Sequence, residues 1–211
     1  NLNFFNEDIH LLFYFLFLLI IFFVFLNFEN NFSELFLSLT SSISNVGFSL
    51  NSSPNNLSFV FLILVIIGGS FFSTSSGIRF LKIYSLFKYS INEILSYSRP
   101  KNIYINKHLF SKDTFKLDEI YKYFLSVIVF IISLLILTFL LTLSGIDFES
   151  SFKLSILTIM NTVNSSMFGL ADFSFYDLHF ITKYYLIFFM IIGRLELLTL
   201  LIICKKFLFK N

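Results

Sequence analysis

Residues 40–49 of this chain read TSSISNVGFS and separate two stretches that are almost entirely apolar. The first of these stretches covers residues 11–28, and the second covers residues 57–67. A hydroxyl-rich segment with one glycine between two membrane spans has the composition of a pore loop. Irregular backbone lies at membrane depth only where protein buries it or where it lines a water-filled path. Its carbonyl groups can then replace the hydration shell of an ion, so the segment predicts a pore.

The composition places the whole chain in a membrane. The chain has 211 residues, of which 56% are hydrophobic, and its mean hydropathy is +0.83. A soluble domain does not need so much apolar surface. The single cysteine, Cys204, has no partner for an internal disulfide. Because the chain starts at Asn1 rather than at a methionine, we expect a piece of a longer protein, without a signal peptide.

Charge placement predicts how the spans cross the membrane. The apolar stretches lie at residues 9–28, 57–67 with a weaker continuation over 78–95, 121–143 and 184–209. Nine Lys and Arg residues lie between residues 77 and 122, whereas residues 27–58 contain none. Three more lysines lie near the end of the chain. The positive-inside rule therefore puts the basic connector and the C-terminus in the cytoplasm.

The two halves of the chain repeat the same pattern. Each half reads as a span, an acidic turn, an amphipathic stretch, a polar segment and a second span. The matching features lie about 120 residues apart and have the same orientation, as in a parallel repeat of membrane units. The fold class predicted is an all-α membrane protein with two parallel span–pore helix–loop–span repeats, which is half of a four-repeat pore.

Three regions follow from this division. Residues 1–95 form the first of the two units, with a broken second helix, and residues 119–211 form the second unit. The connector, residues 96–118, is too short to bury a core of its own, and its alternating residues 102–106 predict one short strand.

The second apolar stretch ends at a run of small residues, 68–77, that reads GGSFFSTSSG. At the helical rise, residues 57–67 cover only about 17 Å of a hydrocarbon layer about 30 Å thick. The break therefore falls inside the membrane. This favours a gate below the pore loop over the alternative, which is a simple helix break at the membrane edge.

Three motifs together resemble the TrkH-type subunit of the Trk/Ktr/HKT potassium transporter superfamily. They are SNVGFS at residues 44–49, the small-residue run continued by Ile78 and Arg79, and GRLEL at residues 193–197. The connector that begins with Arg99 and Pro100 also resembles that family, so the resemblance covers nearly the whole chain. It implies that this chain supplies the third and fourth of four membrane–pore–membrane repeats.

The resemblance also implies a function and partners. It implies potassium uptake across the bacterial inner membrane through a selectivity filter, in a homodimer regulated by a cytoplasmic nucleotide-binding ring of the TrkA type. The transported ion is K⁺ or, in a less selective pathway, also Na⁺. No covalently bound cofactor and no nucleic acid partner is implied.

The site residues follow residue by residue. The filter positions are Ser44, Asn45, Val46, Gly47, Phe48, Asn164, Ser165, Ser166 and Met167. The gate positions are Gly68, Gly69, Ser70, Ser73, Thr74, Ser75, Ser76 and Gly77, and Arg194 is the charge beside the pore.

Two of these assignments have alternatives. In the second filter segment, residues 164–170, Met167 takes the place of the filter glycine; a shift of two residues would instead give that place to Gly169. Arg194 lies within an apolar run, where a charge is costly unless it is paired or hydrated. It therefore faces the pore or forms an ion pair between helices.

Other classes of function have weaker support. The sequence contains no Walker loop, catalytic triad or cysteine cluster, and its three histidines are scattered, so we do not expect an enzyme. A non-conducting membrane scaffold with a decayed filter remains the alternative to an ion pathway.

Overall fold

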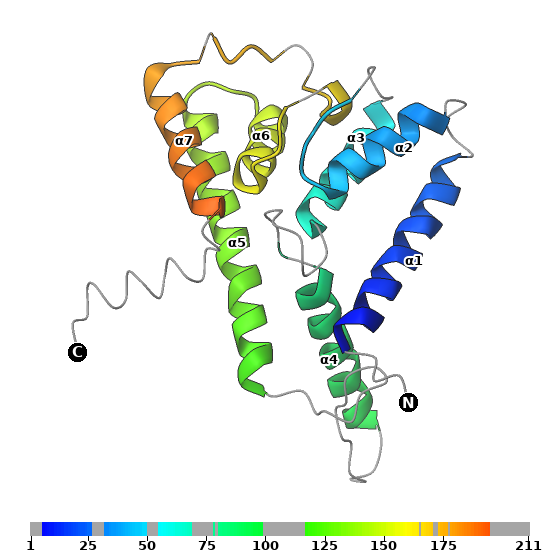
Figure 1. The fold of residues 1–211 in the computed structure, drawn as a ribbon. Helices are drawn as coiled ribbons and strands as arrows, with labels where there is room; N and C mark the ends of the chain where they lie inside the picture. The colour runs from blue at the N-terminus through cyan, green and yellow to red at the C-terminus, as the bar shows by residue number, and fades with distance from the viewer. Residues whose placement is uncertain are drawn as a thin grey trace, which may run out of the picture.

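The computed structural model describes residues 6–26, 32–49, 55–68, 78, 80–98, 117–164, 166–170, 173–176 and 178–194. Within these residues every regular element is a helix (Figure 1). The helices are α1 (Asn6–Leu26), α2 (Phe32–Ile43), α3 (Asn55–Ile67), α4 (Phe80–Ser98), α5 (Leu117–Leu143), α6 (Phe148–Met160), the 3₁₀-helix η1 (Ser166–Phe168) and α7 (Phe180–Arg194). This confirms the predicted all-α fold class.

A long helix, a short helix, a loop and a third helix occur in this order twice. In the first half, α1 packs on α2 and α2 packs on α3; in the second half, α5, α6 and α7 all pack on one another. Both short helices carry an acidic residue in the first turn, Glu34 in α2 and Glu149 in α6. A carboxylate at this end of a helix interacts favourably with the positive end of the helix dipole.

One apolar core joins the two halves. The helix α3 packs on both α6 and η1, while α4 packs on α5. Fully buried side chains come from every helix around this junction, including Leu35 of α2, Phe61 and Val65 of α3, and Leu137 of α5. The core therefore fixes the short helices α2 and α6 relative to each other, and this positions the loops that follow them.

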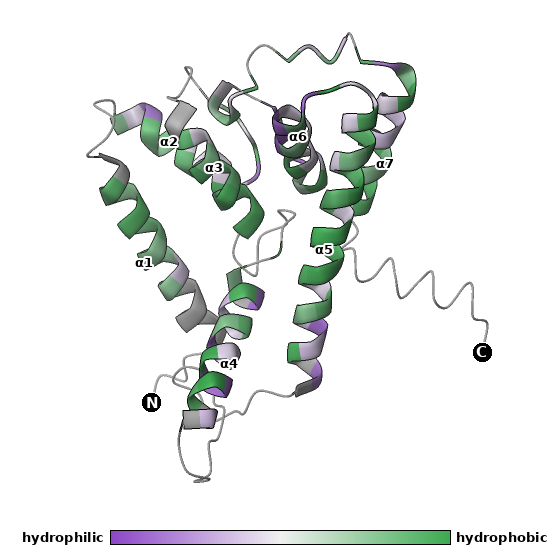
Figure 2. Ribbon diagram, turned by 180° about the vertical axis from the view of Figure 1, so that it is seen from behind, coloured by the Kyte–Doolittle hydropathy of each residue, from purple (hydrophilic) through white to green (hydrophobic). Residues whose placement is uncertain are grey.

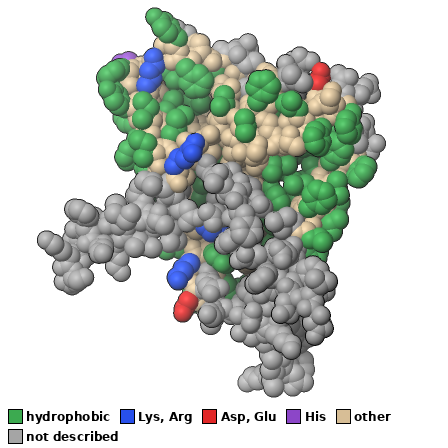
Figure 3. Space-filling view, viewed as in Figure 1, with side chains coloured by type: hydrophobic (Ala, Val, Ile, Leu, Met, Phe, Trp, Pro, Cys, Tyr) green, Lys and Arg blue, Asp and Glu red, His purple; other side chains and the backbone are tan. Residues whose placement is uncertain are grey.

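The outer surface is apolar as well. Among the described residues, one helical segment, Ile120–Leu143 of α5, is long and apolar enough to span a membrane, and shorter apolar segments lie in α1 and α3. Large apolar side chains on the outside of these helices are more than half exposed, including Phe23, Leu135 and Phe139. The ribbons of α1, α5 and α7 are largely in the hydrophobic colour in Figure 2, and Figure 3 shows apolar side chains on the surface over α1 and α7. Such a surface is favourable against lipid and unfavourable against water.

The helix α3 ends where the small-residue run begins. The helix α3 stops at Ile67, and Gly68 follows with φ = 69°. A positive φ suits glycine, which has no Cβ to clash with the backbone. Residues 69–77, the strand predicted at 102–106 and the last span beyond Arg194 lie outside the described residues.

Candidate functional site

The two short helices end in the same way. Each is followed by an asparagine in the left-handed conformation, Asn45 after α2 with φ = 57° and Asn161 after α6 with φ = 55°. The next amide then bonds back five residues, from Val46 to the carbonyl of Ser41 at 3.0 Å and from Thr162 to that of Leu157 at 2.9 Å. Asparagine tolerates this conformation better than most residues, and this hydrogen-bond pattern is a common way to end a helix.

The loops that follow the two helices contact each other directly. The amide of Val163 donates a hydrogen bond to the carbonyl of Val46 at 3.2 Å. Gly47, with φ = 81°, lies so close to the other loop that a Cβ there would collide with the Val163 carbonyl oxygen and lie 2.8 Å from Cγ2 of Thr162. The positive φ and the short distance to the second loop therefore both require glycine at position 47.

Hydroxyl groups hold the backbone of the first loop. The amide of Phe48 donates to Oγ of Ser41 at 2.6 Å, and the hydroxyl of Ser44 donates to the carbonyl of Thr40 at 2.7 Å. Across the two loops, Oγ of Ser49 and Oγ of Ser166 lie 3.2 Å apart. The hydroxyl groups of residues 40–49 thus satisfy backbone groups at the end of α2 and in the loop that follows it.

The first five predicted filter residues, 44–48, lie together in the loop after α2. Val46 and Phe48 are 52% and 58% exposed, and Val163 of the facing loop is 66% exposed. On the other side of the second loop, Oγ1 of Thr162 and Oδ1 of Asn164 are buried without a hydrogen-bond partner among the described atoms. Ser166 starts η1, while Ser165 lies outside the described residues.

Matching the ends of the two short helices gives the second filter segment a register that differs from the predicted one. If Asn161 corresponds to Asn45, then Thr162 corresponds to Val46 and Val163 corresponds to Gly47. The register expected from the sequence instead aligns Met167, or alternatively Gly169, with Gly47. Gly169 follows η1 and lies well beyond the end of α6.

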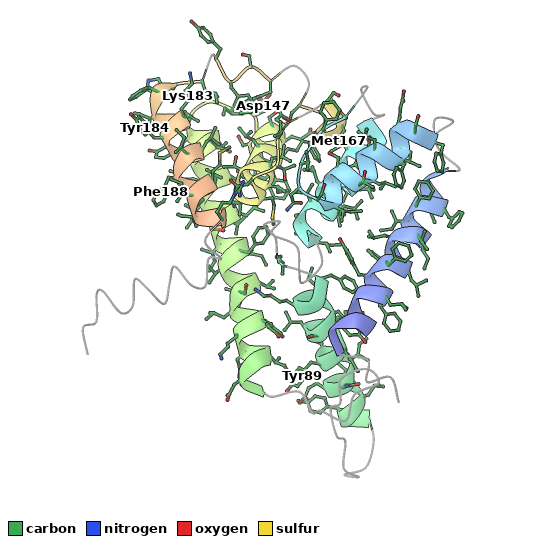
Figure 4. All side chains as sticks on the ribbon, viewed as in Figure 1. Tyr89, Asp147, Met167, Lys183, Tyr184 and Phe188 are labelled. Carbon is green, nitrogen blue, oxygen red and sulfur yellow. The ribbon has the colours of Figure 1, made fainter. Side chains whose placement is uncertain are left out.

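Met167 lies behind the loops. Its side chain is fully buried, and the Ser42 hydroxyl donates to its Sδ at 3.8 Å. The helix η1 that carries it packs on α3 (Figure 4). The side chain of Met167 therefore fills space between helices.

One ion pair lies on the outer part of α6. Nζ of Lys153 is 2.6 Å from Oε1 of Glu149, one turn earlier, and lies 3.1 Å from the position that a Cβ at Gly169 would take. The hydrogen bond and the charge of Lys153 lower the pKa of Glu149 below its ordinary 4.5. Any stability from this pair is present above that ordinary pKa and is lost as the pH falls through the lowered one. Because Glu149 is exposed, the contribution is small.

A hydrogen bond joins the break after α3 to the helix α1. The hydroxyl of Tyr14 in α1 donates to the carbonyl of Gly68 at 2.6 Å, and the amide of Ile78 donates to the carbonyl of Ile66 at 3.3 Å. The Tyr14 ring lies 5.0 Å from the ring of Phe80 in α4. Of the predicted gate residues, the structure describes Gly68; Gly69, Ser70, Ser73, Thr74, Ser75, Ser76 and Gly77 lie outside the described residues.

Replacing Tyr14 with phenylalanine tests the hydrogen bond between Tyr14 and Gly68. The variant keeps the ring but leaves the buried Gly68 carbonyl without its hydroxyl donor. We expect the free energy of unfolding to fall by about 1–3 kcal/mol, the usual cost of an unsatisfied buried acceptor. Thermal unfolding of the detergent-purified protein measures this. A Tyr97→Phe variant in α4, where the side chain is 84% exposed, is the control, and an equal loss in both variants would contradict a specific role for Tyr14.

The predicted pore charge, Arg194, is the last described residue of α7, and its side chain is exposed. The glycine before it lies against the end of α6, and the side-chain amide of Asn161 donates to the carbonyl of Met190 in α7 at 3.0 Å. The sequence prediction missed Asn161, Thr162 and Val163. An asparagine directly after an amphipathic stretch was the signal that marks them, because it is a common helix-ending residue.

The described residues contain no group of three or more His, Cys, Asp or Glu side chains able to hold a metal ion. The oxygens gathered at the two loops are instead carbonyl, hydroxyl and amide oxygens. Ion-selective filters in membranes use groups of this kind.

The fold defines the class of this protein, which is an all-helical membrane fold of the TrkH type. A solved structure with this fold is that of the potassium transporter TrkH from Vibrio parahaemolyticus, which matches with a TM-score of 0.78 at 22% sequence identity. The match covers 93% of this chain and 43% of that chain, so this chain spans less than half of its length. No family model and no curated protein sequence matches the chain.

Proposed function

We propose that this chain forms part of a potassium uptake pathway across the bacterial inner membrane. The observation that carries the proposal is the contact between the loops after α2 and α6, made by the Val163–Val46 hydrogen bond and by Gly47. Two irregular segments, each at the C-terminal end of a short helix inside an apolar structure, form a built site for an ion. The similarity to the TrkH structure supports K⁺ as that ion.

The physical basis is electrostatic. The C-terminal end of a helix carries a partial negative charge, and α2 and α6 both point this end at the loops. A cation at the loops would be stabilised by these two helix ends and by backbone carbonyl oxygens, without a charged side chain. In the first loop we assign this role to residues 44–48. In the second loop we extend the predicted set, Asn164 to Met167, toward the helix end to include Thr162 and Val163.

Further parts of the proposal rest on the family resemblance. They are a gate at residues 68–77, Arg194 as a charge near the pathway, a homodimer, a cytoplasmic regulator of the TrkA type and a cytoplasmic C-terminus. Because this chain spans 43% of the TrkH chain, two further loops are needed to close a four-part filter.

A less selective Na⁺ and K⁺ pathway is the second candidate. It is favoured by Val163, which occupies the place of Gly47 in the second loop and has a Cβ. A filter backbone with positive φ is less favourable with a side chain at that position, so the second loop would hold its carbonyls differently from the first.

Growth at low K⁺ tests the proposal. The complete protein is expressed in a bacterial strain that lacks its own K⁺ uptake systems, and growth and cellular K⁺ are measured against an empty vector. We expect growth to be restored at submillimolar K⁺. Uptake of Na⁺ and K⁺ at equal rates would favour the less selective pathway. Normal insertion into the membrane without uptake of either ion would favour a non-conducting scaffold.

A further inference from the structure

The final described turn of α7 lies directly against the end of the short helix α6. A Cβ at Gly193 would collide with the carbonyl oxygen of Ile159, lie 2.9 Å from its carbonyl carbon and lie 3.1 Å from Nδ2 of Asn161. Glycine permits this approach because it has no side chain. The distance between α7 and the last turn of α6 is therefore shorter than a side chain at position 193 would allow.

The same place carries a specific hydrogen bond. Asn161 uses its backbone to end α6 and its side-chain amide to bond the Met190 carbonyl of α7 at 3.0 Å. Met190 is one turn before Gly193 on the same helix. Asn161 and Gly193 thus form one contact, which we name the α6–α7 latch.

The latch lies next to the contact between the loops. Asn161 is followed by Thr162 and Val163, which pack against Gly47, and Val163 donates to the carbonyl of Val46. A shift of α7 relative to α6 would move Asn161, and Asn161 is joined to the loop contact by only two peptide units. The geometry of the loops consequently depends on the latch.

We propose that Asn161 and Gly193 are positioning residues that set the spacing of the two loops and through it the preference for K⁺ over Na⁺. This inference rests on the proposed function. Selectivity at a filter of oxygen atoms depends on the number and placement of those atoms, so a small displacement of one loop changes the discrimination more than it changes the fold.

Three substitutions separate positioning from stability. Asn161→Asp keeps the shape and the tolerance for positive φ, but it sets a carboxylate oxygen against the Met190 carbonyl. Asn161→Gly keeps the conformation and removes the bond. Gly193→Ala forces α6 and α7 apart. Gly145→Ala is the matched glycine control, because Gly145 also has a positive φ, 89°, but no neighbour within 4 Å of a Cβ.

Transport is the first readout. In cells expressing the complete protein, we expect the three latch variants to reduce the ratio of K⁺ to Na⁺ uptake severalfold, because selectivity depends on the placement of the filter oxygen atoms. We expect Gly145→Ala to keep the wild-type ratio. Latch variants that are less stable or less abundant but keep the ratio would overturn the proposal and leave a purely structural role.

A second readout does not depend on transport. A pair of cysteines at Val46 and Val163, in a Cys204→Ser background, reports the approach of the two loops by disulfide formation. We expect Asn161→Asp and Gly193→Ala to slow this cross-linking, and Gly145→Ala to leave it unchanged. Unchanged cross-linking in the latch variants overturns the latch. Slowed cross-linking in a protein that transports no ion supports the latch and overturns the proposed function.

Discussion

Replacing Gly47 with alanine is expected to lower K⁺ uptake by at least about tenfold while the protein still inserts into the membrane. Gly47 has φ = 81°, a conformation that costs an L-residue about 1–2 kcal/mol. An added Cβ would also collide with the Val163 carbonyl oxygen and approach Cγ2 of Thr162 at 2.8 Å. The neighbouring atoms are mostly backbone, so the second loop must move. Initial rates of K⁺ uptake, normalised to the amount of protein in the membrane, measure the effect.

Gly145→Ala again supplies the control for Gly47→Ala. Gly145 lies in the turn between α5 and α6 with φ = 89°, and a Cβ there would meet open space. Both variants therefore carry the cost of an L-residue at positive φ. Of the two, Gly47→Ala also disturbs the contact between the loops. We expect uptake by Gly145→Ala to stay within about twofold of the wild type, since a Cβ at Gly145 displaces no neighbouring atom and Gly145 lies outside the two loops. Equal losses in the two variants would show that backbone strain, and not the contact with Val163, explains the result.

The helices were predictable because their signals are local. Runs of apolar residues long enough to cross a membrane gave the spans, and Gly68 with Gly69 after a run too short to cross gave the break that the structure places after Ile67. The amphipathic stretches before the two polar segments gave α2 and α6. Each of these features needs only neighbouring residues, so one sequence contains enough information to find it.

The pairing of the loops was not predictable in the same way. Val46 and Val163 are far apart in the sequence, and they meet because α3 packs on α6. The filter residues predicted for the second half begin at Asn164, whereas the loop after α6 begins at Asn161. Gly193 precedes Arg194 in the motif at residues 193–197, but its close approach to Ile159 depends on how α6 and α7 pack. Such contacts are properties of the tertiary structure.

Replacing Met167 with alanine is expected to destabilise the protein strongly. The side chain is fully buried, it accepts a contact from Ser42 of α2, and it lies on η1, which packs on α3. Removing three heavy atoms leaves a cavity between elements that the rest of the core holds in place. We expect the free energy of unfolding to fall by about 2–5 kcal/mol, as for other buried large-to-Ala changes. Met167→Leu keeps the volume, so we expect it to cost less than about 1.5 kcal/mol.

The same variants decide what Met167 does for transport. Because its side chain packs between η1, α2 and α3, we expect Met167→Ala and Met167→Gly to reduce the amount of folded protein but to keep the ratio of K⁺ to Na⁺ uptake per molecule in the membrane. Thermal unfolding and ion uptake measured on one preparation separate the two effects. A changed ratio with unchanged stability would restore the register in which Met167 stands against Gly47. That outcome would also mean that the matching ends of α2 and α6, at Asn45 and Asn161, do not mark equivalent positions in the two loops.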